Sequence, residues 1–217
     1  MDFFREIQHM RTLIAAALLA AMPFTAAAAD GVSYTYVEAG WNKVEINDDW
    51  LGDPDGDGGY LRGSFAIADN VHLFGGYSVA SKTYRYDGAR VKYEVAQPEF
   101  GIGYHQAFTD RLDFTADLAW LRLNAEAKIS GTGDADLDGT YKDHVNGGRA
   151  TVGLRGKPSA RTELWVKGGY IDGSDFEGSF AGYLGGQVGF NRTWGLVGEV
   201  EVIEDTTRYS LGVRASF

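Results

Sequence analysis

The last eleven residues, Thr207-Arg208-Tyr209-Ser210-Leu211-Gly212-Val213-Arg214-Ala215-Ser216-Phe217, decide the fold class. From Tyr209 onward, apolar or aromatic residues stand at every second position, and serine, glycine or arginine stands between them. A period of two is the pattern of a β-strand with one apolar face and one polar face. The chain is therefore expected to end in a strand whose apolar face consists of Tyr209, Leu211, Val213, Ala215 and Phe217.

The same alternation continues backwards along the chain. Leu118 and Trp120, for example, share a face opposite Asp113 and Asp117. Segments of about ten alternating residues, separated by turn residues, are typical of transmembrane barrels. We predict an all-β protein, a transmembrane antiparallel up-and-down β-barrel of ten strands, or of eight if two segments belong to loops. The expected strands are 32–46, 59–68, 71–83, 91–107, 111–127, 146–156, 161–172, 179–190, 194–204 and 207–217.

The connections between these segments alternate in length. Short turns are expected at 68–70, 108–110, 156–159 and 191–193. The connections between them are mostly longer and richer in Gly and Asp, at 47–58, 84–90, 128–145, 173–178 and a tight 205–206. Bacterial outer-membrane barrels have short periplasmic turns and longer extracellular loops. The pattern therefore predicts that both chain ends lie on the periplasmic side.

Alternation alone does not separate a membrane barrel from a soluble sandwich, because both have one apolar face. The positions of the aromatic residues favour the barrel, because they gather near both ends of the strands as two interfacial belts. One belt lies toward the short turns and consists of Phe65, Tyr104, Phe114, Phe190, Trp194 and Phe217. The other lies toward the long loops and consists of Trp41, Tyr77, Trp120, Tyr170 and Tyr209.

The N-terminus has the features of a cleaved signal peptide. Arg11 precedes a short apolar run, and the small residues Ala27 and Ala29 stand at the positions that a signal peptidase requires. The run is shorter than the about 20 residues of a transmembrane helix. We expect residues 1–29 to be the signal peptide, with Asp30 as the first mature residue. Residues 1–9 add nothing to the signal, so translation from Met10 is an open alternative.

The composition excludes several classes of protein. The formal net charge of −10 argues against nucleic acid as a partner. The chain contains no Cys, so it has no disulfide framework, no thiolate metal site and no cysteine nucleophile. Residues 30–217 are expected to form one exported domain in the outer membrane of a Gram-negative bacterium.

The strand phases place many charges inside the barrel. Charges in a narrow lumen are costly unless they are paired, so a nearly balanced set indicates a plug of salt bridges. A wide barrel leaves an aqueous channel, whereas an eight-stranded interior is filled by side chains. A narrow channel is therefore the alternative to a closed lumen. The expected inward charges are Glu38, Glu99, Asp113, Asp117, Glu163, Glu199 and Glu201, with Arg62, Arg149, Arg155, Lys167, Arg208 and Arg214.

The net negative charge is then expected in the loops. Two loops repeat carboxylates at alternate positions before a glycine, which resembles the first half of a calcium-binding loop. The closing bidentate Glu of such a loop is missing from both, so solvated acidic loops are the main interpretation and no metal or cofactor is expected. Weak Ca²⁺ binding, or divalent bridging to lipopolysaccharide, is the sharper hypothesis for Asp53, Asp55, Asp57, Asp134, Asp136 and Asp138.

No catalytic constellation is evident. His72 and His105 stand beside short turns, and only His144 belongs to a long loop. No motif for a nucleophile accompanies it, such as Gly-x-Ser-x-Gly or His-Glu-x-x-His. We therefore expect a protein that is not an enzyme, with a barrel hydrolase as the third hypothesis.

Three stretches of the mature chain carry a resemblance to a known family, namely Ser33-Tyr34-Thr35-Tyr36-Val37-Glu38, Val71-His72-Leu73-Phe74-Gly75-Gly76-Tyr77 and Asn191-Arg192-Thr193-Trp194-Gly195. With these stretches the chain resembles the small OmpA/OmpX-type "outer membrane protein β-barrel domain" family, in particular a gammaproteobacterial subgroup, and the resemblance covers nearly all of residues 30–217. It implies the fold and the location, but no activity, because that family shares no catalytic site. The terminal Phe217, with its alternating apolar residues, resembles the signal that the barrel-assembly machinery reads.

Three functional hypotheses follow from the sequence. The first is a non-enzymatic integral outer-membrane barrel, with a structural, envelope or surface-interaction role through acidic extracellular loops. The second is a narrow ion or small-solute channel, and the third is an outer-membrane hydrolase. The expected partners are outer-membrane lipid and lipopolysaccharide, with the assembly machinery during biogenesis and no nucleic acid. The expected state is a monomer.

Overall fold

The computed structural model describes residues 31–47, 54–86, 88–133 and 137–217. The signal segment with Ala27, Ala29 and Asp30 lies outside the described residues. Among the described residues, no helix is long and apolar enough to cross a membrane. The strands are β1 (Tyr36–Ile46), β2 (Asp55–Ala68), β3 (Val71–Tyr86), β4 (Ala89–Thr109), β5 (Leu112–Ser130), β6 (Gly139–Ser159), β7 (Thr162–Gly173), β8 (Ser179–Gly189), β9 (Trp194–Ile203) and β10 (Thr206–Ser216).

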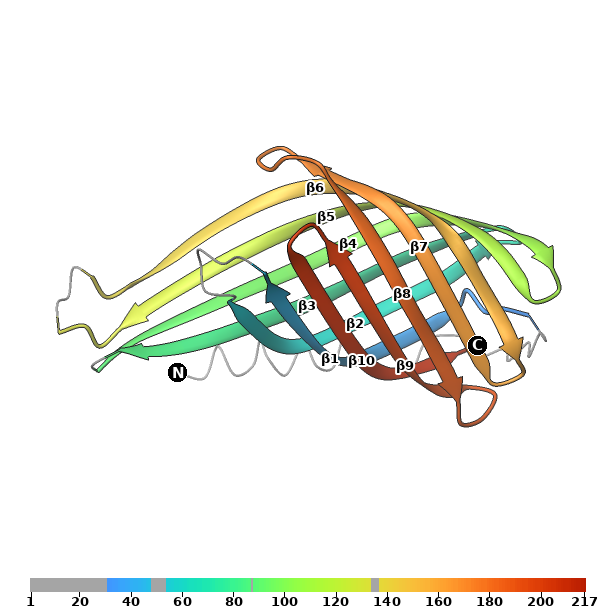
Figure 1. Ribbon diagram of the computed structural model, residues 1–217, viewed down its shortest axis with the longest axis horizontal. Coiled ribbons are helices and arrows are strands. Elements are labelled where there is room, and N and C mark those ends of the chain that lie inside the picture. The colour runs from blue at the N-terminus through green and yellow to red at the C-terminus, as the bar shows by residue number, and fades with distance from the viewer. Residues whose placement is uncertain (1–30, 48–53, 87, 134–136) are drawn as a thin grey trace.

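These strands form one closed barrel in which every strand is antiparallel to both neighbours (Figure 1). The predicted count of ten is confirmed, and the alternative of eight is excluded. The first and last strands close the barrel, with a register that runs from Tyr36 opposite Ser216 to Ile46 opposite Thr206. Closure gives each strand a paired neighbour on both sides within the membrane-spanning part, which is what a lipid environment demands of a sheet.

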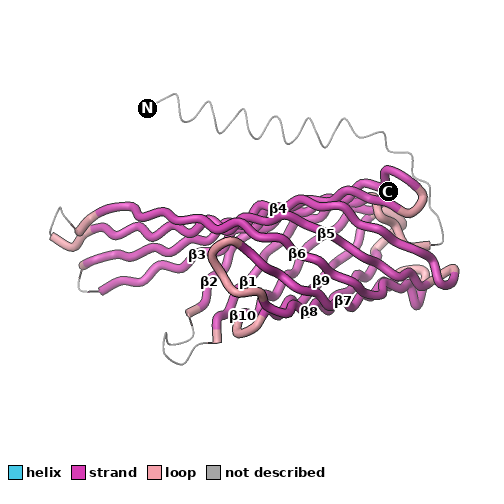
Figure 2. The backbone as a smooth tube through the Cα atoms, turned by 90° about the horizontal axis from the view of Figure 1, so that it is seen from above, coloured by secondary structure: helices cyan, strands magenta, loops and turns pink. Residues whose placement is uncertain are grey.

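Four neighbouring strands, β3 to β6, are the longest of the barrel. β4 and β6 have 21 residues each and β5 has 19, whereas β7 to β10 have 10 to 12. A tilted strand needs about 9–11 residues to cross a membrane. The surplus of β3 to β6 therefore projects beyond the other strands as a four-stranded sheet, to the left in Figures 1 and 2. We call residues 79–86, 89–96, 122–130 and 139–146 the extension.

The extension corrects two predicted loops. Residues 84–90 were expected as a loop, but β3 and β4 continue to a connection at 87–88. Residues 128–145 were also expected as a loop, yet their greater part belongs to β5 and β6, which stay paired as far as Ile129 opposite Gly139. Charged and small residues at alternate positions resembled loop composition. Cross-strand pairing overrides such local preferences, because β-propensity depends on neighbouring strands.

The inner and outer surfaces of the barrel have opposite polarity to those of a soluble protein. On the outer surface, Phe100 and Leu118 are each 62% exposed. On the inner surface, Glu38 is 2% exposed and Arg214 is 4% exposed. Apolar groups outside and charges inside are stable only when lipid surrounds the barrel.

The aromatic belts are confirmed as outward-facing. Trp41, Tyr77 and Tyr170 project from the outer surface toward the extension, and each is between 44% and 52% exposed. Phe65, Phe190 and Trp194 do so beside the short turns, at 49% to 60% exposed. The part of the barrel between the two belts is the membrane-spanning part.

Candidate functional site

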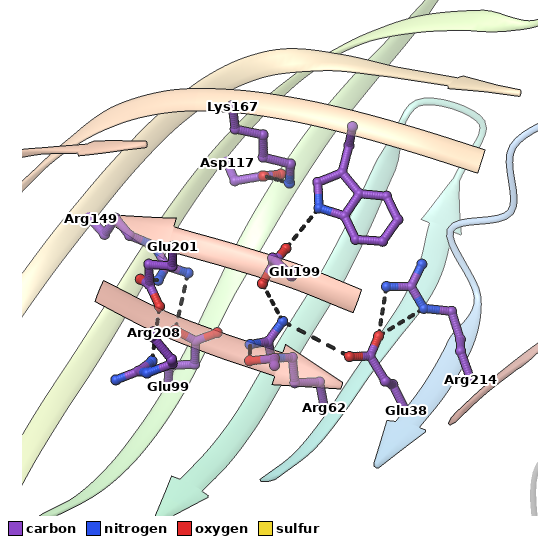
Figure 3. A network of polar contacts seen from close by, with 12 residues as sticks. Glu38, Arg62, Glu99, Asp117, Arg149, Lys167, Glu199, Glu201, Arg208 and Arg214 are labelled. Atoms are coloured by element: carbon purple, nitrogen blue, oxygen red, sulfur yellow. Dashed lines mark hydrogen bonds and ion pairs between the residues drawn. The ribbon is translucent and has the colours of Figure 1, made fainter. Parts of the chain in front are cut away.

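An ion-pair network crosses the inside of the barrel (Figure 3). Glu38 Oε2 accepts hydrogen bonds from Nε and Nη2 of Arg214 at 2.8 and 2.6 Å. Arg62 Nη1 lies 4.0 Å from Glu38 Oε1 and 2.6 Å from Glu199 Oε1. Trp165 Nε1 donates to Glu199 Oε2 at 2.7 Å. These contacts link β1, β2, β7, β9 and β10 across the lumen.

A second cluster stands beside the first. Arg149 lies 3.0 Å from Glu99 and 3.8 Å from Glu201. Arg208 pairs with Glu201 at 3.0 Å and donates to Gln97 Oε1 at 2.6 Å. Because each guanidinium contacts two partners, no charge of this cluster faces the lumen alone.

Of the remaining inward charges, four form ion pairs, and Asp113 accepts a hydrogen bond from Tyr34. Arg155 bonds to Glu163 at 2.6 Å, and Lys167 bonds to Asp117 at 2.6 Å. The predicted salt-bridged interior is confirmed. Its acids are Glu38, Glu99, Asp113, Asp117, Glu163, Glu199 and Glu201, and its bases are Arg62, Arg149, Arg155, Lys167, Arg208 and Arg214.

Tyr34 fills the mouth of the barrel at the short-turn end. It is 6% exposed and donates a hydrogen bond to Asp113 Oδ2 at 2.8 Å. Its ring stacks on His105, with 3.6 Å between the ring centroids, and the Arg155 guanidinium lies 4.8 Å from its centroid. Arg155 also donates to the carbonyl of Ser33 at 2.9 Å. The segment before β1 is thereby held across the mouth.

The sequence did not reveal this seal. The strand predicted over 32–46 begins only at Tyr36, and Tyr34, just before it, is buried against Asp113. His72 joins the same cluster, with Nε2 3.5 Å from Asp117 Oδ1 and Nδ1 3.4 Å from His105 Nδ1. Tyr34 and Tyr36 fit the alternation of a strand, so the pattern gave no sign that one of them leaves it.

A cavity of about 120 Å³ remains between the two clusters and the Tyr34 seal. Arg62, Glu199 and Asp117 are among the residues that line it. A polar cavity of this size has room for roughly eight to twelve water molecules, because each needs roughly 10–15 Å³ of such volume. The lumen is polar, and ion pairs such as Arg62–Glu199 cross it beside the cavity.

The acidic residues considered for calcium have other partners. Asp55 bonds to Lys82, which lowers the pKa of the Asp55 carboxyl, and Asp57 accepts from Trp41 Nε1 at 3.4 Å. Both lie on β2 and not in the predicted loop 47–58. Among the described residues, no group of three His, Asp or Glu side chains is arranged to hold a metal ion.

In the second acidic segment considered for calcium, Asp138 also has partners within the protein. Asp138 accepts hydrogen bonds from the backbone N–H groups of Gly131 and Thr132 at 2.9 and 3.1 Å, which lowers the pKa of its carboxyl. It therefore organises the β5–β6 connection. Asp53, Asp134 and Asp136 lie outside the described residues.

His144 does not belong to a loop but to β6, where it stands opposite Asn124 on the outer face of the extension. Its backbone N–H bonds to Asp143. Within the described part of the chain, no hydrogen bond joins its ring to a serine or threonine hydroxyl. Nothing there resembles a nucleophile with its base.

The two faces of the extension differ in chemistry. The register places Tyr93 opposite Ala127, and Ala127 opposite Tyr141, on the face that continues the inner wall. Tyr93 and Tyr141 are 51% and 56% exposed. The inner face is apolar and also carries Tyr84, Val91, Val95, Leu123, Ala125, Ile129 and Val145, with Lys82 and Asp143 at its margins. The outer face is charged, so the polarity of the wall reverses above the membrane.

The last strand matches its predicted pattern. Tyr209, Leu211 and Val213 face outward and are 41% to 53% exposed. Ala215 is 5% exposed, because it lies between Trp194 and Val37 on the neighbouring strands. The backbone N–H of Phe217 donates to the Thr35 carbonyl at 2.9 Å, which ties the C-terminus to the start of the barrel.

Comparison with known proteins gives similarity in fold. No protein-family model and no curated protein sequence matches the chain. Among solved structures, the attachment invasion locus protein Ail of Yersinia pestis is 10% identical, with a TM-score of 0.44, over 85% of this chain and 99% of that chain. Neisserial surface protein A is 14% identical, with a TM-score of 0.42, over 85% and 98% of the two chains.

The translocator domain of the autotransporter NalP from Neisseria meningitidis is 11% identical, with a TM-score of 0.48, over 100% of this chain and 98% of that domain. At these identities and TM-scores, the likenesses carry no information about function.

Closed strands, an apolar exterior, a paired polar interior and two aromatic belts define the class of this protein. It is a transmembrane β-barrel of the outer-membrane type. Within that class it is a ten-stranded barrel with a lumen crossed by ion pairs and a four-stranded extension.

Proposed function

We propose that this chain is a non-enzymatic integral protein of the Gram-negative outer membrane that displays the extension at the cell surface. The observation that carries the proposal is the asymmetry of the wall. Four neighbouring strands continue beyond the membrane, while the lumen beneath them is crossed by ion pairs. A protein built to pass solutes has no use for a rigid projecting sheet, whereas a structural or surface-interaction protein does.

Two features of the extension support an interaction role. Its inner face exposes aromatic side chains such as Tyr93 and Tyr141. β6 pairs with β7 only from Gly147 onward, so residues 139–145 pair on one side alone within the described structure. An unpaired strand edge beside an apolar surface favours contact with another molecule. We therefore propose the extension, and not the acidic loops, as the surface that interacts with other molecules.

The channel remains the second candidate from the sequence, but the geometry supports it less well. The Arg62–Glu199 pair crosses the lumen, and Tyr34 fills the mouth at the short-turn end. The hydrolase is supported least, because His144 is set on a sheet face without a nucleophile at its ring. Membership of the OmpA/OmpX-type family is part of the proposal, and it accords with the fold and with Phe217 at the C-terminus.

Single-cysteine labelling on intact cells tests location and orientation. The chain has no native cysteine, so each introduced thiol reacts against a clean background. We expect Tyr93→Cys and Tyr141→Cys to react with a membrane-impermeant maleimide on intact cells. Asp110→Cys, at the short turn between β4 and β5, should react only after the outer membrane is permeabilised. Leu118→Cys, in the lipid-facing band, is the control that stays unlabelled throughout.

The reverse pattern, with Asp110→Cys labelled on intact cells and Tyr93→Cys protected, would contradict the orientation. If Tyr93→Cys and Tyr141→Cys were both protected on intact cells, the proposed surface role would be wrong. Neither result would bear on the ion-pair network inside the barrel.

The assembly role of the last strand is a further part of the proposal, with the barrel-assembly machinery as the partner and a monomer as the product. Phe217→Ser should leave most of the protein out of the membrane, whereas Phe217→Tyr should insert normally, because an aromatic terminus is kept. The measurement is the fraction of heat-modifiable, folded barrel in isolated outer membranes. Equal insertion of both variants would argue against the assembly role.

A further inference from the structure

The outer surface of the barrel is hollowed where small residues interrupt the apolar band. Gly148 and Ala150 on β6, with Gly168 on β7, form the floor of the hollow. Leu118 on β5 and Tyr170 on β7 form its sides. Two adjoining hollows of about 640 and 810 Å³ share Leu118, Ala150 and Tyr170, and so make one groove. An apolar groove on a surface that faces lipid has the chemistry to hold an acyl chain.

The upper end of this groove leads onto the extension. Trp120 and Gly148 line that end. The next outward positions are Arg122 on β5 and Asn146 on β6, which stand opposite each other. Successive outward positions on a strand lie about 6–7 Å apart. Arg122 is therefore the first outward residue beyond Trp120 on β5, on the side toward the extension.

From Arg122 upward, the outer face of the extension is basic. The register aligns Arg85 with Arg90, and Lys92 with Lys128, on this face. Its two acids, Glu94 and Glu126, are opposite each other. The six bases are Arg85, Arg90, Lys92, Arg122, Lys128 and Lys142. The chain as a whole has 20 bases and 30 acids, so this face has the opposite charge to the protein.

Most of these bases have no acidic partner. Lys92 bonds to Glu94 at 2.6 Å, and Lys142 bonds to Glu126 at 2.9 Å. Glu94 and Glu126 therefore each have a basic partner already. Among the described residues, no carboxylate lies within 4.0 Å of the four other bases, Arg85, Arg90, Arg122 and Lys128. A sheet face with four unpaired cations attracts an anion with several charges.

We propose that the groove and the basic face together bind one phosphorylated glycolipid of the outer leaflet. An acyl chain lies along Ala150 and Leu118, and a phosphate oxygen accepts a hydrogen bond from Arg122. Lys128 and Arg90, about 20 and 26 Å farther along the sheet, attract the anionic head group through their charge. Asp172 lines the β7 side of the upper end, so the phosphates sit on the β5 side. The inference rests on the proposed orientation of the extension toward the cell exterior.

The arrangement favours a lipid over a soluble anion. Among the described residues of the extension, the cations without a carboxylate partner stand only on the face that continues the lipid-facing wall, and the inner face is mostly apolar. A soluble polyanion would reach either face equally well. A lipid whose tail lies in the groove can present its phosphates to the outer face alone.

The test uses the full barrel refolded in detergent and measures dissociation constants for three probes. The probes are lipid A with both phosphates, its dephosphorylated form, and inositol hexakisphosphate as a soluble phosphate. The head-group variant is Arg90→Gln/Arg122→Gln/Lys128→Gln. Its charge-matched control is at the short turns, with Arg111→Gln/Arg161→Gln/Arg192→Gln.

The groove variant is Gly148→Leu/Gly168→Leu. It fills the groove without touching the barrel wall, because an added Cβ at Gly148 comes no nearer than 3.9 Å to another atom and none lies within 4 Å at Gly168. The control is Gly63→Leu/Gly198→Leu on β2 and β9, outside the groove, where the atom nearest to an added Cβ is 3.7 Å away at both positions. Folding of every variant is checked by its heat-modifiable mobility.

We expect the head-group variant to weaken lipid A binding by about tenfold or more, because the charge-assisted contact of Arg122 and the attraction of two further cations are lost. The groove variant should weaken it several-fold, and both controls should bind as the native chain does. Dephosphorylated lipid should bind the native chain about as weakly as the phosphorylated lipid binds the head-group variant. Equal loss in the head-group variant and its control, or no loss in the groove variant, would overturn the proposal.

Strong binding of inositol hexakisphosphate that ignores the groove variant would also overturn it, by assigning the basic face to a soluble anion. Binding in detergent does not depend on orientation in a cell. A failure of cysteine labelling and a failure of lipid binding therefore remain distinguishable.

Discussion

Glu38→Gln should lower the free energy of unfolding by about 3–5 kcal/mol, since loss of one partner leaves buried cations uncompensated. The side chain is 2% exposed and bonds twice to Arg214, with Arg62 within 4.0 Å. Glutamine keeps the shape but not the charge, so both guanidinium groups face each other across a neutral amide. Urea unfolding in lipid vesicles, followed by tryptophan fluorescence, measures the effect.

The matched control is Glu94→Gln. Glu94 also pairs with a base, Lys92, at 2.6 Å, but on the exposed outer face of the extension. Water screens that pair, so a change of no more than about 1 kcal/mol is expected. A small effect at both positions would mean that the interior network contributes little to stability.

Arg62→Ser/Glu199→Ser should turn a silent barrel into a conducting one. The native chain is expected to show no stable single-channel steps in a planar bilayer, because this pair at 2.6 Å crosses the lumen beside the cavity. Removing an acid and a base together leaves the net interior charge unchanged, so the fold is preserved while the passage widens. Stable steps should then appear in the double variant.

The control is Lys92→Ser/Glu94→Ser, which removes an equivalent pair from the extension and should remain silent. Steady steps from the native chain would revive the channel hypothesis. Silence of the double variant would show that the seal of Tyr34 against Asp113 and His105 suffices to close the barrel.

Much of the fold was predictable from the sequence, because alternate residues of a barrel strand face the lipid and the lumen and differ in polarity accordingly. Leu118 and Trp120 against Asp113 and Asp117 gave the phase, and the structure confirms it. The interior charges followed from the same phase. The near balance of acidic and basic interior residues could be counted in the sequence. Which residues pair could not be predicted, because pairs such as Glu38 and Arg214 meet only when the first strand pairs with the last.

Other features were beyond local pattern. The extension was taken for loops, since Gly139 and the charged residues around it resemble a turn until β5 is placed beside them. The inward course of Tyr34 depends on Asp113 and His105, which are distant in sequence. The groove required three small residues on two strands to meet, which only the register of β6 with β7 determines.

The sequence by itself thus predicted a barrel of ten strands, with eight as the alternative, and with apolar residues outside and nearly balanced charges inside. It also predicted the signal peptide and the apolar face of the last strand, because each depends on residues that are contiguous or alternate in the sequence. The tertiary structure decided how long the strands are, which charges pair, what seals the mouth and where the outer face turns basic. Those properties depend on register between strands, and register is set by contacts among residues far apart in the chain.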